Sequence, residues 1–286
     1  MTEHFSTQWL GLRELFDHTA RSLQLAKRLA EMLSRRPRIV DLGGGTGSLF
    51  RFLAPIVGRG QDWLLLDADG FLLDEAFGRT AAWARTRGFA ATAIGDTLNV
   101  STPRGLWRMQ VALHDLNTGL LPSSDGAQAP DAIVCSALLD LVSAAWLRRL
   151  CCSVSVPVLA CLIADGRDVW RPRHRYDPIV LNGFRRDMRR DKGFGPALGT
   201  DAIRSIASIG VANLAASAPS DWHIPPGALH MQRALIDITA DAARAAGAAQ
   251  ARAITEWQST RLRQALYGRL AITIGHRDIL LLPSGG

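Results

Sequence analysis

Short apolar runs, several of them closed by an acidic residue, alternate along the chain with segments of helical periodicity. The run Ile39–Leu42 contains Asp41, and the run Trp63–Leu66 is followed at once by Asp67. Runs of this length without strict alternation are typical of parallel strands that are buried on both faces. Five such strands are predicted, at residues 38–42, 63–67, 108–117, 131–135 and 157–164.

The segments between and after these runs favour helices. Apolar residues recur at helical spacing in residues 48–54, Ser143 is a candidate N-cap for the helix that follows it, and Thr200 is a candidate cap for residues 200–210. A sixth strand is predicted at 211–216, and residues 270–283 predict the closing strand or strand pair. Strands that alternate with helices predict an α/β fold with a doubly wound, mostly parallel, seven-stranded sheet.

A glycine-rich turn separates the first strand from the first helix of this pattern. Gly43, Gly44, Gly45 and Gly47 remove the Cβ atoms where the backbone must turn sharply and approach a ligand. The helix that follows directs free N–H groups and a positive dipole end at the turn, so the segment predicts a nucleotide-type site. The spacing is not the G-x-G-x-x-G of dinucleotide sites, and Asp41 would repel a pyrophosphate.

With Asp41, Gly43, Gly45 and Gly47 in the pattern (D/E)-x-G-x-G-x-G, the chain resembles the class I S-adenosylmethionine-dependent methyltransferases. The resemblance implies a Rossmann-like methyltransferase fold and S-adenosyl-L-methionine as cofactor, whose sulfonium and ammonium suit an acid at the loop. It implies that Asp67, or its neighbour Asp69, accepts hydrogen bonds from ribose hydroxyls and that Asp115 accepts from the adenine amino group. The expected cofactor-binding residues are Asp41, Gly43, Gly44, Gly45, Gly47, Asp67, Ala68, Asp115, Leu116 and Ser136.

The whole chain is expected to divide into a lid, a core and two insertions. Residues 1–35 are expected to form a helical N-terminal lid, with one amphipathic helix over about 8–33. Arg13, Asp17 and Arg21 on this helix either reach the cofactor or form helix-surface ion pairs. The cofactor-binding core is expected at 36–170, an arginine-rich lid insertion at 171–199, core again at 200–222, a two-helix insertion at 223–268, and the closing strands at 269–286.

The arginine-rich segment suggests where an acceptor binds. It follows the fifth strand, at the ligand edge of the sheet, and arginine forks bind carboxylate or phosphate in a bidentate manner. The expected substrate-binding residues are Trp170, Arg171, Arg173, Arg175, Lys192 and Phe194. A solvated helix in which Asp177, Asp187 and Asp191 pair with neighbouring arginines is the alternative.

No local pattern identifies the acceptor atom or a catalytic metal. His174, in the arginine-rich segment, is the preferred general base, with His114, His223 and Asp140 as other candidates. Cys135 at the end of the fourth strand is expected to be a core thiol. The function that fits best is methyl transfer to the oxygen or nitrogen of a small, anionic metabolite. An RNA methyltransferase and an inactive methyltransferase-fold partner protein are the alternatives.

Composition narrows the class of partner. The net charge of +7 and a pI near 10.0 suggest nucleic acid, but arginine supplies nearly all the positive charge and no lysine-rich tail is present, so nucleic acid is not favoured. No apolar run is long enough to span a membrane, the first residues do not resemble a signal peptide, and four unpaired core cysteines are expected; together these predict a cytoplasmic protein. The 223–268 insertion either walls the substrate side or forms a homodimer surface.

Overall fold

The computed structural model describes residues 6–121, 129–153, 155–209, 212–247 and 250–283. The helices are α1 Thr7–Ala20, α2 Leu23–Met32, α3 Ser48–Val57, α4 Gly70–Thr86, α5 Ala144–Ser153, α6 Asp177–Met188, α7 Ala202–Ile209, α8 Leu229–Ala245 and α9 Ala251–Leu266. The strands are β1 Arg38–Leu42, β2 Gln61–Asp67, β3 Ala90–Ile94, β4 Thr97–Thr102, β5 Gly105–Leu113, β6 Ala132–Ser136, β7 Val158–Ala164, β8 Val169–Arg171, β9 Ala212–Pro219, β10 Trp222–Ile224, β11 Ala271–Ile274 and β12 His276–Pro283. A short 3-10 turn, Gly199–Asp201, precedes α7.

The large sheet has the order β3-β4-β5-β2-β1-β6-β7-β12-β9. Its five central strands, β5-β2-β1-β6-β7, are parallel, while the two strands at each edge pair antiparallel. Strands β2 to β5 lie on one side of β1, and β6 then pairs with β1 on its other side. The strand order therefore reverses between β1 and β6. Ligands of doubly wound sheets bind at that reversal, beyond the carboxyl ends of the strands.

The predicted α/β class and parallel centre are confirmed, but the sheet has nine strands rather than seven. The two additional strands are β3 and β4, a hairpin at the edge of the sheet that pairs with β5. Gly95, with φ +59°, lies in its two-residue turn and adopts the left-handed conformation that this connection requires.

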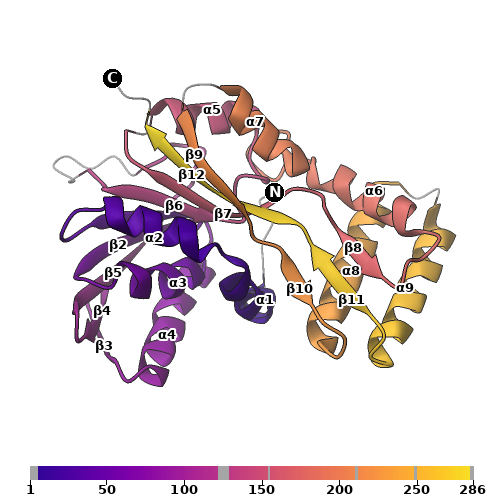
Figure 1. The fold of residues 1–286 in the computed structure, drawn as a ribbon, viewed down its shortest axis with the longest axis horizontal. Helices are drawn as coiled ribbons and strands as arrows, with labels where there is room; N and C mark the ends of the chain where they lie inside the picture. The colour runs from indigo at the N-terminus through magenta and orange to yellow at the C-terminus, as the bar shows by residue number, and fades with distance from the viewer. Residues whose placement is uncertain (1–5, 122–128, 154, 210–211, 248–249, 284–286) are drawn as a thin grey trace.

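Helices cover both faces of the large sheet (Figure 1). Helices α2, α3 and α4 cover one face, where a core forms around Ile39, Trp63 and Leu65. Helices α5 and α7 cover the other face, over Val40, Leu42 and Leu66. Neighbouring residues of β1 and β2 therefore enter opposite cores, as the alternation of side chains along a strand dictates.

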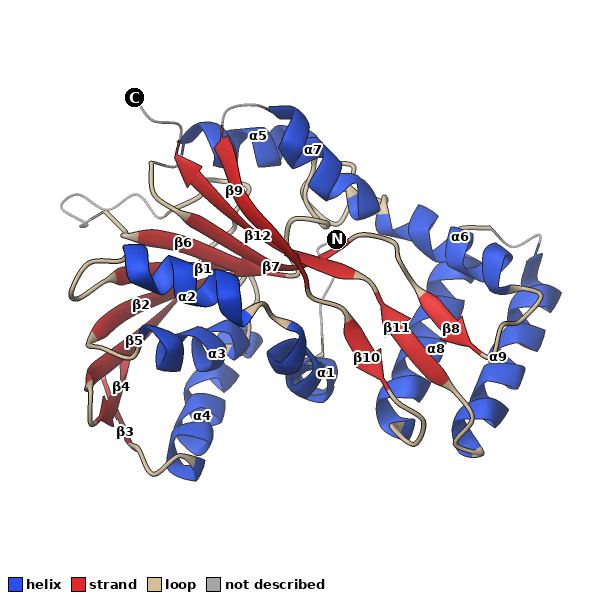
Figure 2. Cartoon of the chain, viewed as in Figure 1, coloured by secondary structure: helices blue, strands red, loops and turns tan. Residues whose placement is uncertain are grey.

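A second lobe extends from one edge of the large sheet (Figure 2). Its three-stranded sheet, β10-β11-β8, continues the chain path of β9, β12 and β7 with antiparallel pairing. Helices α6, α8 and α9 pack on one another beside this sheet. The arginine-rich segment and the two-helix insertion thus form one structural unit instead of two separate additions to the core.

The N-terminal segment is two helices, not the single predicted helix over 8–33. Helix α1 ends at Ala20, and the Ser22 side chain caps α2 by accepting a hydrogen bond from the Leu25 N–H. The Ser22 N–H donates to Asp278 Oδ2 at 2.7 Å, which ties the break to β12. Because the Ser22 side chain accepts from a free N–H at the start of α2, a new helix begins here and the amphipathic pattern is interrupted.

The remaining predictions concern cysteines and membrane segments. Cys135, Cys151 and Cys161 are buried free thiols as expected, whereas Cys152 is exposed. Within the described ranges, every helix is too short or too polar to cross a membrane.

Candidate functional site

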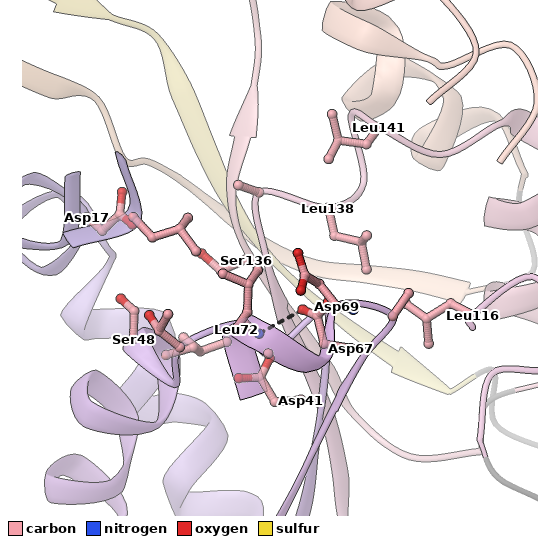
Figure 3. A pocket seen from close by; sticks show the side chains of 18 of the residues that line it. Asp17, Asp41, Ser48, Asp67, Asp69, Leu72, Leu116, Ser136, Leu138 and Leu141 are labelled. Carbon is pink, nitrogen blue, oxygen red and sulfur yellow. Dashed lines mark hydrogen bonds between the residues drawn. The ribbon is translucent and has the colours of Figure 1, made fainter. Parts of the chain in front are cut away.

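The carboxyl ends of β1, β2 and β6 meet at a cavity of about 210 Å³ beside the glycine turn. Figure 3 shows Asp41, Asp67 and Asp69 around its floor, with Ser48 and Ser136 at one side and Leu116 at the other. The cavity-lining residues that the sequence predicted are Asp41, Gly43, Gly44, Gly45, Asp67, Ala68, Leu116 and Ser136. Four strand ends, those of β1, β2, β5 and β6, thus bring eight of the ten expected cofactor residues to one place.

The glycine turn has the backbone that its sequence predicts. Gly43, Gly45 and Gly47 have φ values of +67°, +49° and +81°, which favour glycine over any other residue. Gly44 has another reason to be glycine, because an added Cβ would lie 2.9 Å from Leu65 Cβ. Gly47 does not line the cavity; it lies against Arg51 and Thr80 and directly precedes α3.

Asp67 holds this turn in place. Its Oδ2 accepts from the Gly45 N–H at 2.9 Å and its Oδ1 accepts from the Asp69 N–H at 2.9 Å. Burial raises the pKa of Asp67, and these backbone donors act in the opposite direction. Asp69 in turn caps α4 by accepting from the Phe71 N–H. Both residues line the cavity, and a carboxylate can accept several hydrogen bonds.

Asp41 is the most unusual ionisable group of the site. It is 1% exposed, and neither of its carboxylate oxygens has a hydrogen-bond partner within the described structure. Burial raises its pKa to about 8; Arg21 opposes this shift and Asp67 adds to it. A buried carboxylate without a partner is costly. A cationic ligand in the cavity would compensate this cost and favour the ionised form.

Side chains from the first helices close one side of the cavity. Arg13 binds Asp17 at 3.1 Å, and Arg21 lies 3.7 Å from the same carboxylate. Arg21 also donates to Ser48 Oγ at 3.1 Å and to Ser136 Oγ at 3.0 Å. The predicted ion pairs are present, and Arg13, Asp17 and Arg21 all line the first cavity.

Asp115 differs from the other predicted acids in its placement. Its side chain is exposed and its Oδ1 accepts from the backbone and side-chain nitrogens of Asn117. His114 and Leu116, on either side of it, line the cavity instead. The adenine contact assigned to Asp115 stays a prediction, and the cavity wall at this strand end is made by its neighbours.

A second cavity, of about 680 Å³, opens next to the first. It lies between α1, the ends of β6 and β7, the small sheet, and helices α6 and α8. Four residues line both cavities: Arg13, Ala137, Leu141 and Lys192. Ala137 follows β6 with φ +52°, an uncommon conformation for alanine that is found at functional sites. A volume of this size is ordinary for small-molecule sites.

Three arginines of the predicted lid do not reach either cavity. Arg171, Arg173 and Arg175 are exposed and line neither cavity, because β8 carries them along the small sheet towards α9. Arg175 pairs with Glu256 at 2.7 Å. His174 also lies outside both cavities; its Nδ1 accepts from the Tyr176 N–H, and burial lowers its pKa. It is therefore not placed to act as a base on a ligand in either cavity.

The other three predicted substrate residues do reach the cavities. Trp170 is 2% exposed, lines the second cavity and contacts Trp257 edge-on with ring centroids 5.0 Å apart. Phe194 lines the first cavity and packs on Trp146. Lys192 lines both and pairs with Asp187 at 3.3 Å. The loop after α6 therefore lies where the two cavities meet.

Most residues of the second cavity have no local signal in the sequence. Asp140 is one of several predicted base candidates, and the structure places it in this wall with His276 and Trp222. These residues come from the loop after β6, from β12 and from β10, so no sequence spacing joins them.

Comparison with known proteins gives matches only at the level of structure. No protein-family model and no curated protein sequence matches the chain. A methyltransferase from Thiobacillus denitrificans, solved with S-adenosyl-L-homocysteine, has 12% identity and a TM-score of 0.47, with 99% of this chain and 100% of that chain covered. A methyltransferase from Geobacter sulfurreducens with the same ligand has 14% identity, a TM-score of 0.44 and coverage of 95% and 98%. The cyclopropane synthase MmaA2 from Mycobacterium tuberculosis has 12% identity, a TM-score of 0.42 and coverage of 91% and 83%.

At such identities a function has to be derived from this chain's own residues. The strand order reverses beside β1, the glycine turn follows Asp41, and Asp67 supports that turn from the next strand end. Together these features give the chain a doubly wound, Rossmann-like fold with a glycine turn at the reversal of strand order.

Proposed function

We propose that this protein is an S-adenosylmethionine-dependent methyltransferase whose acceptor is a small molecule held in the second cavity. The observation that carries the proposal is Asp41, a buried carboxylate with two unpartnered oxygens at the mouth of a glycine turn. A cofactor with a sulfonium and an ammonium would supply the positive charge that this group lacks. A pyrophosphate would instead meet Asp41, Asp67 and Asp69 together, all on the cavity wall.

The residues around the first cavity would share the cofactor between them. Asp41 would face its cationic part, and Asp67 or Asp69 would accept from ribose hydroxyls. Ala68 and Leu116 would provide apolar contact for the base, while Ser48, Ser136 and Arg21 would meet the polar tail. When bound, the cofactor supplies an activated methyl group, and the protein's main contribution is to align the acceptor with it and to exclude water.

The cations of the second cavity bear on the charge of the acceptor. The anionic metabolite predicted from the sequence depended on the cations of the arginine-rich segment; of these, Arg171, Arg173 and Arg175 line neither cavity, whereas Lys192 lines both. The cations that do line the second cavity are paired: Arg13 with Asp17, and both Arg190 and Lys192 with Asp187. The cavity therefore offers no preference for an anion, and methylation at either oxygen or nitrogen fits the proposal.

An RNA acceptor has less support. Several arginines of the predicted basic cluster bind carboxylates on their own surface, such as Arg175 with Glu256 and Arg189 with Asp201. An inactive partner protein would keep the same cofactor cavity, so turnover has to be tested separately from binding.

Calorimetric titration with S-adenosylmethionine, S-adenosylhomocysteine and NADH tests the cofactor assignment. Both adenosyl ligands should bind and NADH should not. Asp41→Asn keeps the shape of the side chain and removes its charge, so it should weaken S-adenosylmethionine about tenfold or more, the scale of one charge-assisted contact. Asp74→Asn on the exposed surface of α4 is the matched control and should change nothing. Tight NADH binding, or equal affinities in Asp41→Asn and wild type, would contradict the proposal.

A further inference from the structure

The second cavity is lined in part by aromatic rings and by residues with buried polar atoms that lack a partner. We propose that it binds a neutral, planar aromatic acceptor through stacking on its indole walls, and that the Asp140 carboxylate accepts a hydrogen bond from the acceptor's hydroxyl or amino group. This inference rests on the proposed function, because it places the acceptor beside the cofactor cavity.

Aromatic side chains supply the walls. Trp9 of α1 meets Trp222 of β10 edge-on, with ring centroids 6.1 Å apart. Trp170 and Phe184 complete the aromatic lining from β8 and α6. Trp170 and Trp222 are only 2% and 4% exposed, and Trp222 already contacts Arg13 and His276. Trp9 and Phe184 are half-buried, so their rings are the ones that a further ring can reach. An aromatic ligand gains from such contacts beyond its buried area.

Unpartnered polar atoms indicate where the ligand's polar group belongs. Of the residues that line this cavity, four have a buried polar atom without a hydrogen-bond partner in the described structure: Asp140 Oδ1, Trp170 Nε1, Trp222 Nε1 and His276 Nδ1. Asp140 is 7% exposed and His276 is also 7% exposed. A buried polar atom that lacks a partner is destabilising, so four around one cavity favour a ligand that satisfies them.

The charges of the wall favour a neutral molecule. Four carboxylates line the cavity, those of Asp140, Asp168, Asp187 and Asp241. Its three cations are already paired, Arg13 with Asp17 and both Arg190 and Lys192 with Asp187. Burial raises the pKa of Asp140 to about 6, so this carboxylate is ionised at pH 8. An anionic ligand would be repelled there, whereas an O–H or N–H donor would meet an acceptor.

The position of Asp140 connects this site with methyl transfer. Asp140 lies between Ala137 and Leu141 in the chain, and both of these residues line the two cavities. The Gly199 N–H donates to the Asp140 carbonyl at 2.8 Å, which fixes the backbone at this point. A group bound to Asp140 would thus be held near the opening between acceptor and cofactor.

The experiment uses 2-naphthol as a neutral aromatic probe with a hydroxyl, and 2-naphthoate as its anionic counterpart. Each is titrated at pH 8 into the full-length protein saturated with S-adenosylhomocysteine, with tryptophan fluorescence and calorimetry as readouts. We expect 2-naphthol to bind saturably and 2-naphthoate to bind at least tenfold more weakly. Asp140→Asn should weaken 2-naphthol about fivefold and strengthen 2-naphthoate, and Trp222→Leu should weaken both.

Asp74→Asn is again the matched control, and the fluorescence of each variant without probe reports whether it is folded. The inference is overturned if 2-naphthoate binds more tightly than 2-naphthol, if neither binds, or if folded Asp140→Asn binds both probes as the wild type does. Failure of the inference with intact S-adenosylhomocysteine binding leaves the proposed function standing. Loss of S-adenosylhomocysteine binding with intact 2-naphthol binding removes the proposed function alone.

Discussion

Asp278 of β12 binds the backbone of Ser22, 256 positions earlier in the chain, with Oδ2 2.7 Å from the Ser22 nitrogen. Its Oδ1 accepts from the Leu162 N–H at 2.8 Å, where β7 adopts a left-handed φ of +56°. One fully buried carboxylate therefore fixes both the break between α1 and α2 and an irregularity at the wall of the second cavity.

Asp278→Ala should therefore destabilise the protein by roughly 3 kcal/mol, because two buried N–H groups lose a charged acceptor. The free energy of unfolding from urea titration measures this loss. Asp278→Asn keeps one acceptor oxygen and should cost less, and Asp74→Ala on the surface should cost almost nothing. Equal stability of Asp278→Ala and wild type would mean that the two backbone groups find other partners.

The pKa of Asp41 has a consequence for stability without ligand. Since burial raises it from 3.8 to about 8, the folded state binds a proton more tightly than the unfolded state. The resulting stabilisation is complete below about pH 4 and is lost as the pH rises through 8. Asp41→Asn should make the ligand-free protein less sensitive to pH over this range, with a higher Tm at pH 8.

Thermal unfolding of both proteins from pH 5 to 9, without ligand, measures this difference. The same variant should lose cofactor affinity, so greater stability and weaker binding should appear together. Parallel Tm curves for Asp41→Asn and wild type would show that Asp41 does not titrate in this range.

Two glycine-to-alanine substitutions separate the roles of glycine in this chain. Gly44→Ala should destabilise by roughly 1–3 kcal/mol and weaken cofactor binding, because the new Cβ would lie 2.9 Å from Leu65 Cβ. Gly78→Ala, in the exposed interior of α4 with nothing within 4 Å, should stabilise by up to about 1 kcal/mol. Urea unfolding measures both; loss of stability in both variants would mean that the loop is not specially constrained.

The displaced arginine segment also gives a test. Arg173→Ala and His174→Ala should leave the affinities for S-adenosylhomocysteine and 2-naphthol within twofold of the wild type, since neither residue lines a cavity. The same titrations measure this. A tenfold loss of 2-naphthol affinity in either variant would restore the role that the sequence suggested for this segment.

The sequence predicted which residues line the first cavity because the signals for them are local. An apolar run, an acid and a glycine turn lie within ten residues of one another at Arg38–Gly47, and the fold needs only to place β2 beside β1. Asp115 shows the limit of that reasoning. Side chains alternate beyond the end of β5, so His114 and Leu116 face the cavity and Asp115 turns to Asn117.

The acceptor side could not be predicted in the same way. Asp140 lies in the loop after β6, and Trp222 and His276 reach the same cavity wall because the edge strands continue into a second sheet. No spacing in the sequence indicates this. The clustered arginines were visible, but clustering alone does not tell whether a segment faces a cavity or the solvent.

The pH dependence of 2-naphthoate binding provides the last prediction. Burial raises the pKa of Asp140 to about 6, while its own amide, the Arg13 guanidinium and the Ala164 amide act in the opposite direction. As the pH falls from 8 through 6, Asp140 is protonated and its repulsion of the probe disappears. We expect 2-naphthoate affinity to rise about tenfold between pH 8 and pH 5. The probe itself stays ionised there, since carboxylic acids have an ordinary pKa of about 4.

Other groups on the cavity wall titrate differently. His276 has its pKa lowered to about 4 by burial and remains neutral above pH 5, and Arg13 stays charged throughout. Asp168 also has its pKa raised by burial, so it could contribute a similar change. Asp140→Asn distinguishes the effect of Asp140 from that of Asp168. The affinity of this variant for 2-naphthoate should be nearly constant from pH 8 to pH 5. A rise in Asp140→Asn equal to that in the wild type would assign the effect to Asp168 and remove Asp140 from the acceptor's polar contact.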